Sequence, residues 1–172
     1  KDFFTSFHKF LIKRNTLGNV TINKQLSTLK TFLKYAKEKG INVDDSYKDF
    51  EIQRESLEVI ALTESEFYRI LDLNLSNNKR LDQVRDVFCF SCMVGLRFSD
   101  ISQLNRSHTK GNRIQLTVKK TKKNITVPLN AIAFNILEKY KDMAKPLPVI
   151  SNQKYNDYIK ELCKIAEINE PI

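Results

Sequence analysis

The chain has 172 residues, of which 41% are hydrophobic and 10% aromatic, a composition that is typical of a globular protein and does not favour a disordered one. It contains no run of about 18 apolar residues and no signal-peptide pattern, so we expect neither a membrane span nor secretion. The formal net charge of +9 is uneven, with +4 over residues 1–55, −2 over 56–104 and +7 over 105–172, which makes nucleic acid the leading class of partner.

Residues 1–50 are predicted to form a helical domain. Residues 3–14 place apolar side chains at helical spacing and are followed by a Gly18-Asn19 turn. Residues 20–39 repeat apolar positions at steps of four and three, and Gly40 is a natural C-terminal stop. The outer faces of this second helix carry small polar and basic side chains, which suit either a DNA groove or water. The candidates for DNA contact on this helix are Lys24, Ser27, Lys30, Thr31 and Lys34.

A connection between two domains is predicted next. Residues 41–60 show no helical stripe, and the linker is placed at residues 51–61. The second domain is expected over residues 62–172. It opens with Thr63 and Glu66, whose side chains have the spacing of a capping box at the start of a helix, with Phe67, Ile70 and Leu71 facing inward.

A helix over residues 79–94 is apolar enough for burial on most of its sides and ends at Gly95. Cys89 and Cys92 within it have the spacing of a metal or redox pair. No second pair of ligands and no His lies near them, so we predict core packing and no metal site. Together with Cys163 they are too few for a disulfide framework, and they fit a reducing cytoplasm.

The hydrophobic period then changes from that of a helix to that of a strand. Apolar and polar residues alternate over residues 114–118, and residues 125–128 return as the second strand of a hairpin after a turn at residues 122–124. Two further helices are predicted over residues 130–142 and 152–167. The predicted fold class is therefore mainly α, with a small β-hairpin.

Two basic side chains are candidates for chemistry. Arg97 lies near a helix start, where free amides favour an anion, and its guanidinium can bind a phosphate through two hydrogen bonds; the alternative is a surface residue or a partner of Asp100. Lys120 can enter a groove or donate a proton to a leaving oxygen, and the alternative is a solvated turn. The basic run around it favours a polyanionic partner, although Lys-rich surfaces also serve solubility alone. The other candidates for DNA contact in this run are Lys119, Lys122 and Lys123.

Together these segments resemble the tyrosine recombinases, the phage-integrase family. Residues 94–101, Val-Gly-Leu-Arg-Phe-Ser-Asp-Ile, are similar to the first signature box of the family, which holds its first catalytic arginine. The hairpin that contains Lys120-Thr121-Lys122 and closes on Val127-Pro128-Leu129 is similar to the catalytic-lysine hairpin. Residues 21–36 resemble the helical, SAM-like core-binding domain. The likeness covers the whole chain and is strongest to integrases of bacterial mobile elements.

The resemblance implies site-specific DNA recombination through a 3′-phosphotyrosyl link, without metal or other cofactor. Arg97 would contact the scissile phosphate, and Lys120 would protonate the 5′-oxygen leaving group. Asp100 would orient its catalytic neighbours. The implied partners are double-stranded DNA and other recombinase protomers, in the bacterial cytoplasm and on the nucleoid, with no membrane.

The remaining catalytic groups of the family are expected outside this sequence. Its His-x-x-Arg box, a later His or Trp and the nucleophilic Tyr lie downstream of a helix like residues 152–167, and the sequence stops at Pro171-Ile172. It also starts at Lys1, without Met and inside a helical pattern. We therefore expect a piece of a recombinase that binds DNA and does not cut it alone, and we assign no nucleophile among its six tyrosines. The alternatives are a purely DNA-binding helical protein and an RNA-binding or protein-interaction module.

Overall fold

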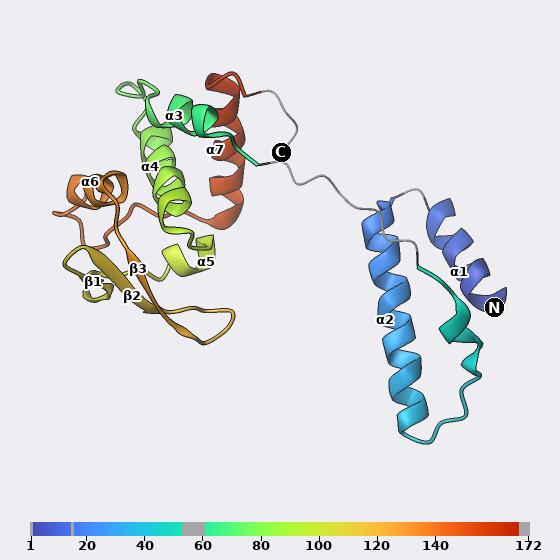
Figure 1. The fold of residues 1–172 in the computed structure, drawn as a ribbon. Coiled ribbons are helices and arrows are strands. Elements are labelled where there is room, and N and C mark those ends of the chain that lie inside the picture. The colour runs from blue at the N-terminus through green and yellow to red at the C-terminus, as the bar shows by residue number, and fades with distance from the viewer. Residues whose placement is uncertain (1, 15, 53–60, 169–172) are drawn as a thin grey trace. The chain divides into compact units, whose positions relative to one another are not determined.

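The computed structural model describes residues 2–14, 16–52 and 61–168, and the chain divides into two units, Lys1–Val59 and Ile60–Ile172. The first, unit 1, contains α1 (Asp2–Lys13), α2 (Asn19–Glu38) and the 3-10 helix η1 (Asp45–Asp49) (Figure 1). The second, unit 2, contains α3 (Glu64–Leu71), α4 (Lys79–Val94), α5 (Phe98–Ile101), the 3-10 helix η2 (Arg106–His108), β1 (Thr109–Lys110), β2 (Arg113–Thr117), β3 (Asn124–Pro128), α6 (Ala131–Lys139) and α7 (Asn152–Ile165). The predicted class, mainly α with a small antiparallel sheet, is confirmed.

One face of α1 packs against one face of α2 in unit 1. Phe4 and Leu11 of α1 are buried in the same core as Ile22 and Leu26 of α2, at the spacing that places side chains on one side of a helix. Gly40 follows the end of α2 with a φ of 80°, in the left-handed region that favours glycine. Both helices predicted near the N-terminus are confirmed.

Residues 41–52 belong to unit 1, and this corrects the expectation of a connection over residues 41–60. η1 buries Tyr47 in the core of unit 1, and Ile52 packs against the same cluster. The carboxylate of Asp44 accepts a hydrogen bond of 2.8 Å from a backbone amide of η1 and caps this short helix. A 3-10 helix of five residues that buries one aromatic ring is too short for a repeated hydrophobic pattern, so the sequence of η1 resembles that of a loop. Residues 53–60 of the expected linker lie outside the described residues.

The central helix of unit 2 is α4, and α3, α6 and α7 pack against it (Figure 1). Leu81, Val87 and Phe90 are buried on different sides of α4, which confirms the predicted burial. The helix ends at Val94 as predicted, because Gly95 adopts a φ of 63°.

The predicted capping box opens α3. The amide of Thr63 donates to the carboxylate of Glu66 at 2.7 Å, and the amide of Glu66 donates to the hydroxyl oxygen of Thr63 at 3.3 Å. Phe67 and Ile70 face the core of unit 2, and Leu71 is half-buried beside them. The helix start is therefore determined by local hydrogen bonds and by burial together.

The sheet of unit 2 has three antiparallel strands in the order β1-β2-β3. In the predicted hairpin, Ile114 of β2 lies opposite Val127 of β3, and Leu116 lies opposite Ile125. Ile114 and Leu116 are buried, and Gln115 between them is more exposed, as the alternating pattern predicts. β1 was not predicted, because a strand of two residues is too short for an alternating pattern.

The helices α6 and α7 end before their predicted limits, at Lys139 and Ile165. The guanidinium of Arg106 donates hydrogen bonds to the carbonyls of Tyr140 and Met143. These oxygens, which follow α6, are thus satisfied without another helical turn. Within the described ranges, no helix combines the length and apolarity needed to cross a membrane.

The three cysteines differ in their environments. Cys89 and Cys163 are buried, as core packing predicts, whereas Cys92 is exposed on α4, which makes that prediction wrong for this residue. Cys92 lies three positions after Cys89 and reaches the surface of α4, whereas Cys89 lies in the core. No metal-binding group of His, Cys, Asp or Glu side chains is present in the parts of the chain that the structure describes.

Thiol labelling of the folded chain is expected to modify Cys92 first. Burial raises the pKa of Cys89 to about 12, so at neutral pH this thiol is both inaccessible and protonated. Cys163 is buried as well, and both thiols become reactive only on unfolding. A maleimide time course read by mass spectrometry measures the order, and Cys92→Ser is expected to remove the fast phase. Labelling of Cys89 at the rate of Cys92 would contradict this packing.

Candidate nucleic-acid interface

Arg97 is exposed directly after the turn that ends α4. It is the N-cap residue of α5, and its carbonyl accepts from the amides of Asp100 and Ile101 at 2.8 and 3.0 Å. Its guanidinium has no hydrogen-bond or ion-pair partner among the described residues, so the alternative of an Arg97–Asp100 pair is not formed. α5 has four residues, which makes any helix-dipole contribution at this position small. The side chain itself is therefore the candidate group for binding an anion here.

Asp100 connects α5 to the β2–β3 hairpin. It is buried, with 1% of its surface exposed, and its Oδ1 accepts a hydrogen bond of 2.8 Å from the backbone amide of Lys119. Gln103, which the sequence analysis did not single out, donates to the same oxygen at 3.4 Å. Because Asp100 lies three residues after Arg97 and Lys119 lies next to Lys120, this contact brings both predicted catalytic residues into one part of unit 2.

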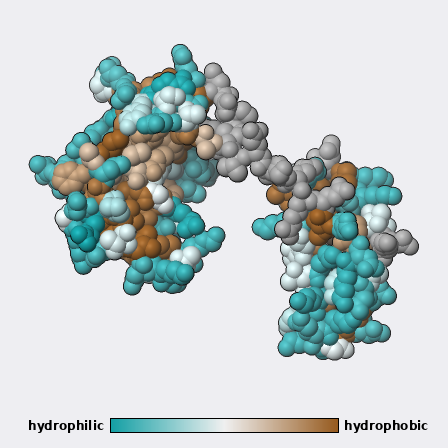
Figure 2. All heavy atoms as spheres, in the orientation of Figure 1, coloured by the Kyte–Doolittle hydropathy of each residue, from teal (hydrophilic) through white to brown (hydrophobic). Residues whose placement is uncertain are grey.

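The turn between β2 and β3 presents a cluster of lysines. The amide of Val118 donates to the carbonyl of Lys123 at 2.8 Å, and the amide of Lys122 donates to the carbonyl of Val118 at 2.8 Å. The turn therefore begins earlier than the predicted residues 122–124, with Lys122 at a φ of 56°. Figure 2 shows hydrophilic residues over this turn. Its exposed lysines are Lys119, Lys120, Lys122 and Lys123.

No acidic side chain pairs with these four lysines within the described part of the chain. Four ammonium groups in one short turn produce a local positive potential, which attracts polyanions and weakens as salt increases. The turn is exposed to solvent, which agrees with the alternative of a solvated turn for Lys120. Its lysines are also accessible to phosphates. These two properties are compatible, because an exposed lysine exchanges water for a phosphate without breaking a bond within the protein.

The outer face of α2 carries most of the other candidates for DNA contact. Lys24 is exposed, and the hydroxyl of Thr31 donates to the carbonyl of Ser27 at 3.0 Å within the helix. Lys34 lies 4.0 Å from Glu38, and both side chains are largely exposed, so this ion pair contributes little. These four residues remain available to a ligand along α2.

Lys30 differs from the other candidates on α2. Its ammonium donates to the backbone carbonyls of Lys48 at 3.1 Å and of Phe50 at 2.9 Å. These bonds hold the end of η1 and the residue that follows it against α2, and two of the three donors of the Lys30 ammonium are already used. Lys30 therefore has a structural role within unit 1, a role that sequence patterns do not reveal because its partners lie 18 and 20 residues away.

The basic segment from Arg106 to Lys123 is divided by the fold. Arg106 binds carbonyls that follow α6, so it is not part of an open basic surface. Lys110 and Arg113 are exposed and lie opposite one another in the β1–β2 register, at the end of the sheet away from the lysine turn. The number of basic residues between Arg106 and Lys123 is therefore larger than the number that one ligand could contact at the lysine turn.

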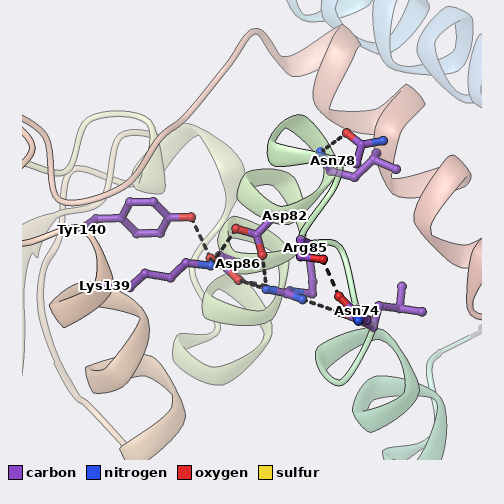
Figure 3. A network of polar contacts seen from close by, with 10 residues as sticks. Asn74, Asn78, Asp82, Arg85, Asp86, Lys139 and Tyr140 are labelled. Carbon is purple, nitrogen blue, oxygen red and sulfur yellow. Dashed lines mark hydrogen bonds and ion pairs between the residues drawn. The ribbon is translucent and has the colours of Figure 1, made fainter.

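A network of charged side chains fixes α4 against α6 (Figure 3). Arg85 donates to both Asp82 and Asp86, and Lys139 donates to the same two carboxylates at 2.7 and 2.6 Å. The hydroxyl of Tyr140 donates to Asp86 at 2.7 Å. Burial, together with the Asp86 hydrogen bond, raises the pKa of Tyr140, which keeps this hydroxyl protonated as a donor. The network therefore holds α4 in place, and Arg97 lies shortly after the end of this helix.

The tyrosines of α7 contribute to packing. Tyr155 is buried with its ring centroid 4.7 Å from that of Phe98, and burial raises its pKa to about 12. The ring of Tyr158 lies under the guanidinium of Arg80 at 4.3 Å. Arg80 also donates two hydrogen bonds of 3.1 Å to Glu161, so it connects α4 to α7.

Comparison with known proteins identifies one domain and one fold. Residues 1–52 match the phage integrase SAM-like domain family. No curated protein matches the chain. Lambda integrase bound to DNA has a similar structure, with a TM-score of 0.76 and 14% identity over 95% of this chain. The Tn1549 transposon integrase in complex with circular intermediate DNA matches with a TM-score of 0.66 and 16% identity over 98% of this chain.

XerA recombinase is a third structural match, with a TM-score of 0.52 and 18% identity over 98% of this chain. The chain spans 62% of the matched lambda integrase chain, 66% of the Tn1549 integrase chain and 62% of the XerA chain. At these identities the solved structures show the fold. The domain match and the shared fold confirm the resemblance to the tyrosine recombinases: residues 1–52 are a phage integrase SAM-like domain, and the chain has the fold of that family.

Proposed function

We propose that this chain binds double-stranded DNA through Arg97 and the lysine turn of unit 2, with the outer face of α2 as a second contact. The observation that supports this most directly is the unpaired charge at one place: Arg97, Lys119 and Lys120 lie around the buried Asp100 and have no acidic partner in the described residues. Unpaired cations on a rigid support bind backbone phosphates without reorganisation of the protein. The structurally similar lambda and Tn1549 integrases were solved with DNA bound.

Within a complete recombinase we assign these residues the roles that the family resemblance implies. Arg97 stabilises the charge on the phosphate under attack, and Lys120 donates the proton that the 5′-oxygen needs to leave. Asp100 holds the turn on which Lys120 lies. The proposed reaction is site-specific strand cleavage and rejoining through a 3′-phosphotyrosine, with no metal or other cofactor.

Other protomers are the second proposed class of partner. Lambda integrase has been solved as a dimer bound to a COC′ core site and as a tetramer bound to a Holliday junction. We propose that the parent protein of this chain also acts as an assembly on DNA, in the bacterial cytoplasm on the nucleoid.

DNA binding without catalysis is the second candidate function. The observation that favours it for this chain is that Tyr155 is buried and the ring of half-buried Tyr158 packs against Arg80, which assigns both α7 tyrosines to packing. Incubation of this chain with a nicked duplex that traps covalent adducts tests the second function, because an adduct would show that the chain cuts DNA by itself. We expect no covalent adduct from this chain, together with reversible binding of the intact duplex.

Fluorescence anisotropy of a labelled duplex across a salt series tests the proposed interface. The double variant Arg97→Ala/Lys120→Ala is expected to bind more weakly at every salt concentration, and the slope of log K against log salt should fall by about two. Lys141→Ala/Lys145→Ala is the matched control, because it removes two exposed lysines that follow α6, away from the turn (Figure 1). Equal losses in both double variants, or an affinity of the wild-type chain that does not change with salt, would contradict the proposal.

A further inference from the structure

The end of β2 exposes backbone groups on the edge that faces away from β3. Val118, the residue after β2, directs its amide to the β3 side of the hairpin, where it donates to the carbonyl of Lys123 at 2.8 Å. In an antiparallel pair, neighbouring residues direct their backbone groups to opposite edges, so Thr117 and Lys119 point away from β3. β1 does not cover them, because its register with β2 includes only Arg113 and Ile114.

Two side chains from the α5 region satisfy these exposed groups. The amide of Lys119 donates to Oδ1 of Asp100 at 2.8 Å, and the carbonyl of Thr117 accepts from Nε2 of Gln103 at 3.0 Å. Nε2 of Gln103 also lies 3.4 Å from Oδ1 of Asp100. Asp100 and Gln103 are three residues apart, on one face of a helical turn. They bind Lys119 and Thr117, of which Thr117 is the last residue of β2 and Lys119 lies two residues further on. We call this set of hydrogen bonds the α5–β2 contact.

We propose that Gln103 is a positioning residue that holds the β2–β3 turn, and with it Lys120, in a fixed relation to Arg97. The consequence for DNA rests on the function proposed above, whereas the hydrogen bonds themselves do not. Asp100 and Gln103 have complementary parts: the carboxylate accepts from the strand, and the primary amide donates both to the strand and to that carboxylate.

The side chain at residue 103 has to donate hydrogen bonds to the carbonyl of Thr117 and to Asp100, and a neutral amide does so. A glutamate at residue 103 would direct only acceptors at the carbonyl of Thr117 and at Asp100, and a methionine would keep the length of the side chain without any donor. Gln103 is exposed, so water replaces its amide when it is removed, and the cost to folding is small. Its removal is therefore expected to change the position and mobility of the turn more than the stability of unit 2.

Amide hydrogen exchange of the whole chain, followed by NMR, tests the α5–β2 contact without DNA. In Gln103→Met the protection of the Lys119 amide is expected to fall about tenfold, which corresponds to about 1.4 kcal/mol, while the thermal midpoint stays within about 3 °C of the wild type. Ser102→Ala is the matched control, because this neighbouring hydroxyl donates only within the α5 region, to the carbonyl of Ser99 at 3.0 Å. Unchanged protection in Gln103→Met would overturn the inference.

Gln103→Glu supplies a readout that a general loss of stability does not produce. Below about pH 4 the introduced carboxyl is protonated and regains an O–H donor for the Thr117 carbonyl. Because the Asp100 carboxylate accepts from the Lys119 amide in both proteins, protection of this amide is compared with that in the wild type at the same pH, and the ratio is expected to rise as the pH falls through this range. A variant that merely destabilised unit 2 would lose protection further on acidification, and that result would contradict the positioning role.

The same variants in the DNA salt series separate this inference from the proposed function. Gln103→Met is expected to bind DNA severalfold more weakly than Ser102→Ala. If the wild-type chain does not bind DNA, the proposed function fails while the exchange data still decide the contact. If exchange at Lys119 increases and DNA affinity is unchanged, the contact does not position Lys120 for DNA, and the inference fails although the proposed function stands.

Discussion

Replacing Asp86 by alanine is expected to lower the free energy of unfolding of unit 2 by about 3 kcal/mol. Asp86 is 3% exposed and accepts hydrogen bonds from Arg85, Lys139 and Tyr140. Its removal leaves the half-buried guanidinium of Arg85 with only one carboxylate partner, Asp82, and leaves the Tyr140 hydroxyl without its acceptor. The loss falls at the lower end for a broken buried pair, because the side chain of Lys139 is 43% exposed and can be solvated.

Asp82→Ala is the matched control for this prediction. Asp82 binds the same Arg85 and Lys139, yet its side chain is 25% exposed, so we expect a loss of about 1 kcal/mol. Urea unfolding monitored by hydrogen exchange and mass spectrometry resolves the two units, and peptides from α4 and α6 should open while those from α2 do not change. Equal effects of the two substitutions would show that burial of Asp86 does not decide the energy of the network.

Asp100→Ala is expected to destabilise unit 2 by about 2 kcal/mol and to weaken DNA binding as well. The substitution leaves the amide of Lys119 without its acceptor, in a region where Asp100 is almost completely buried. The lysine turn then loses its attachment to the α5 region, so Lys120 no longer lies in a defined position relative to Arg97. Circular dichroism during urea unfolding and the anisotropy salt series measure the two effects.

Asp100→Asn separates hydrogen bonding from charge. The asparagine oxygen can still accept from the amide of Lys119, so most of the stability should return if acceptance is the function of the carboxylate. A loss in Asp100→Asn as large as that in Asp100→Ala would contradict this view and would indicate that the negative charge itself is required beside the basic turn.

The sequence predicted most of the secondary structure, for a physical reason that particular elements show. α4 extends from Lys79 to Val94 as predicted, because its apolar content and the glycine at residue 95 are local properties. The start of α3 follows from the capping box of Thr63 and Glu66. η1 and β1 were missed, because a single turn and a two-residue strand are stabilised by contacts with distant residues rather than by a repeated local pattern.

The sequence by itself also determined the family resemblance and the two residues on which the candidate site is based, Arg97 and Lys120, because the motif around each is contiguous. Only the tertiary structure decided which hydrogen bonds the other candidate and charged residues make. It assigns Lys30 to carbonyls within unit 1 and Arg106 to carbonyls after α6, and it joins Asp100 to Lys119 across 19 residues. The physical reason is that a hydrogen bond between distant segments depends on where the fold brings their backbone groups, and no local pattern of side chains records that position.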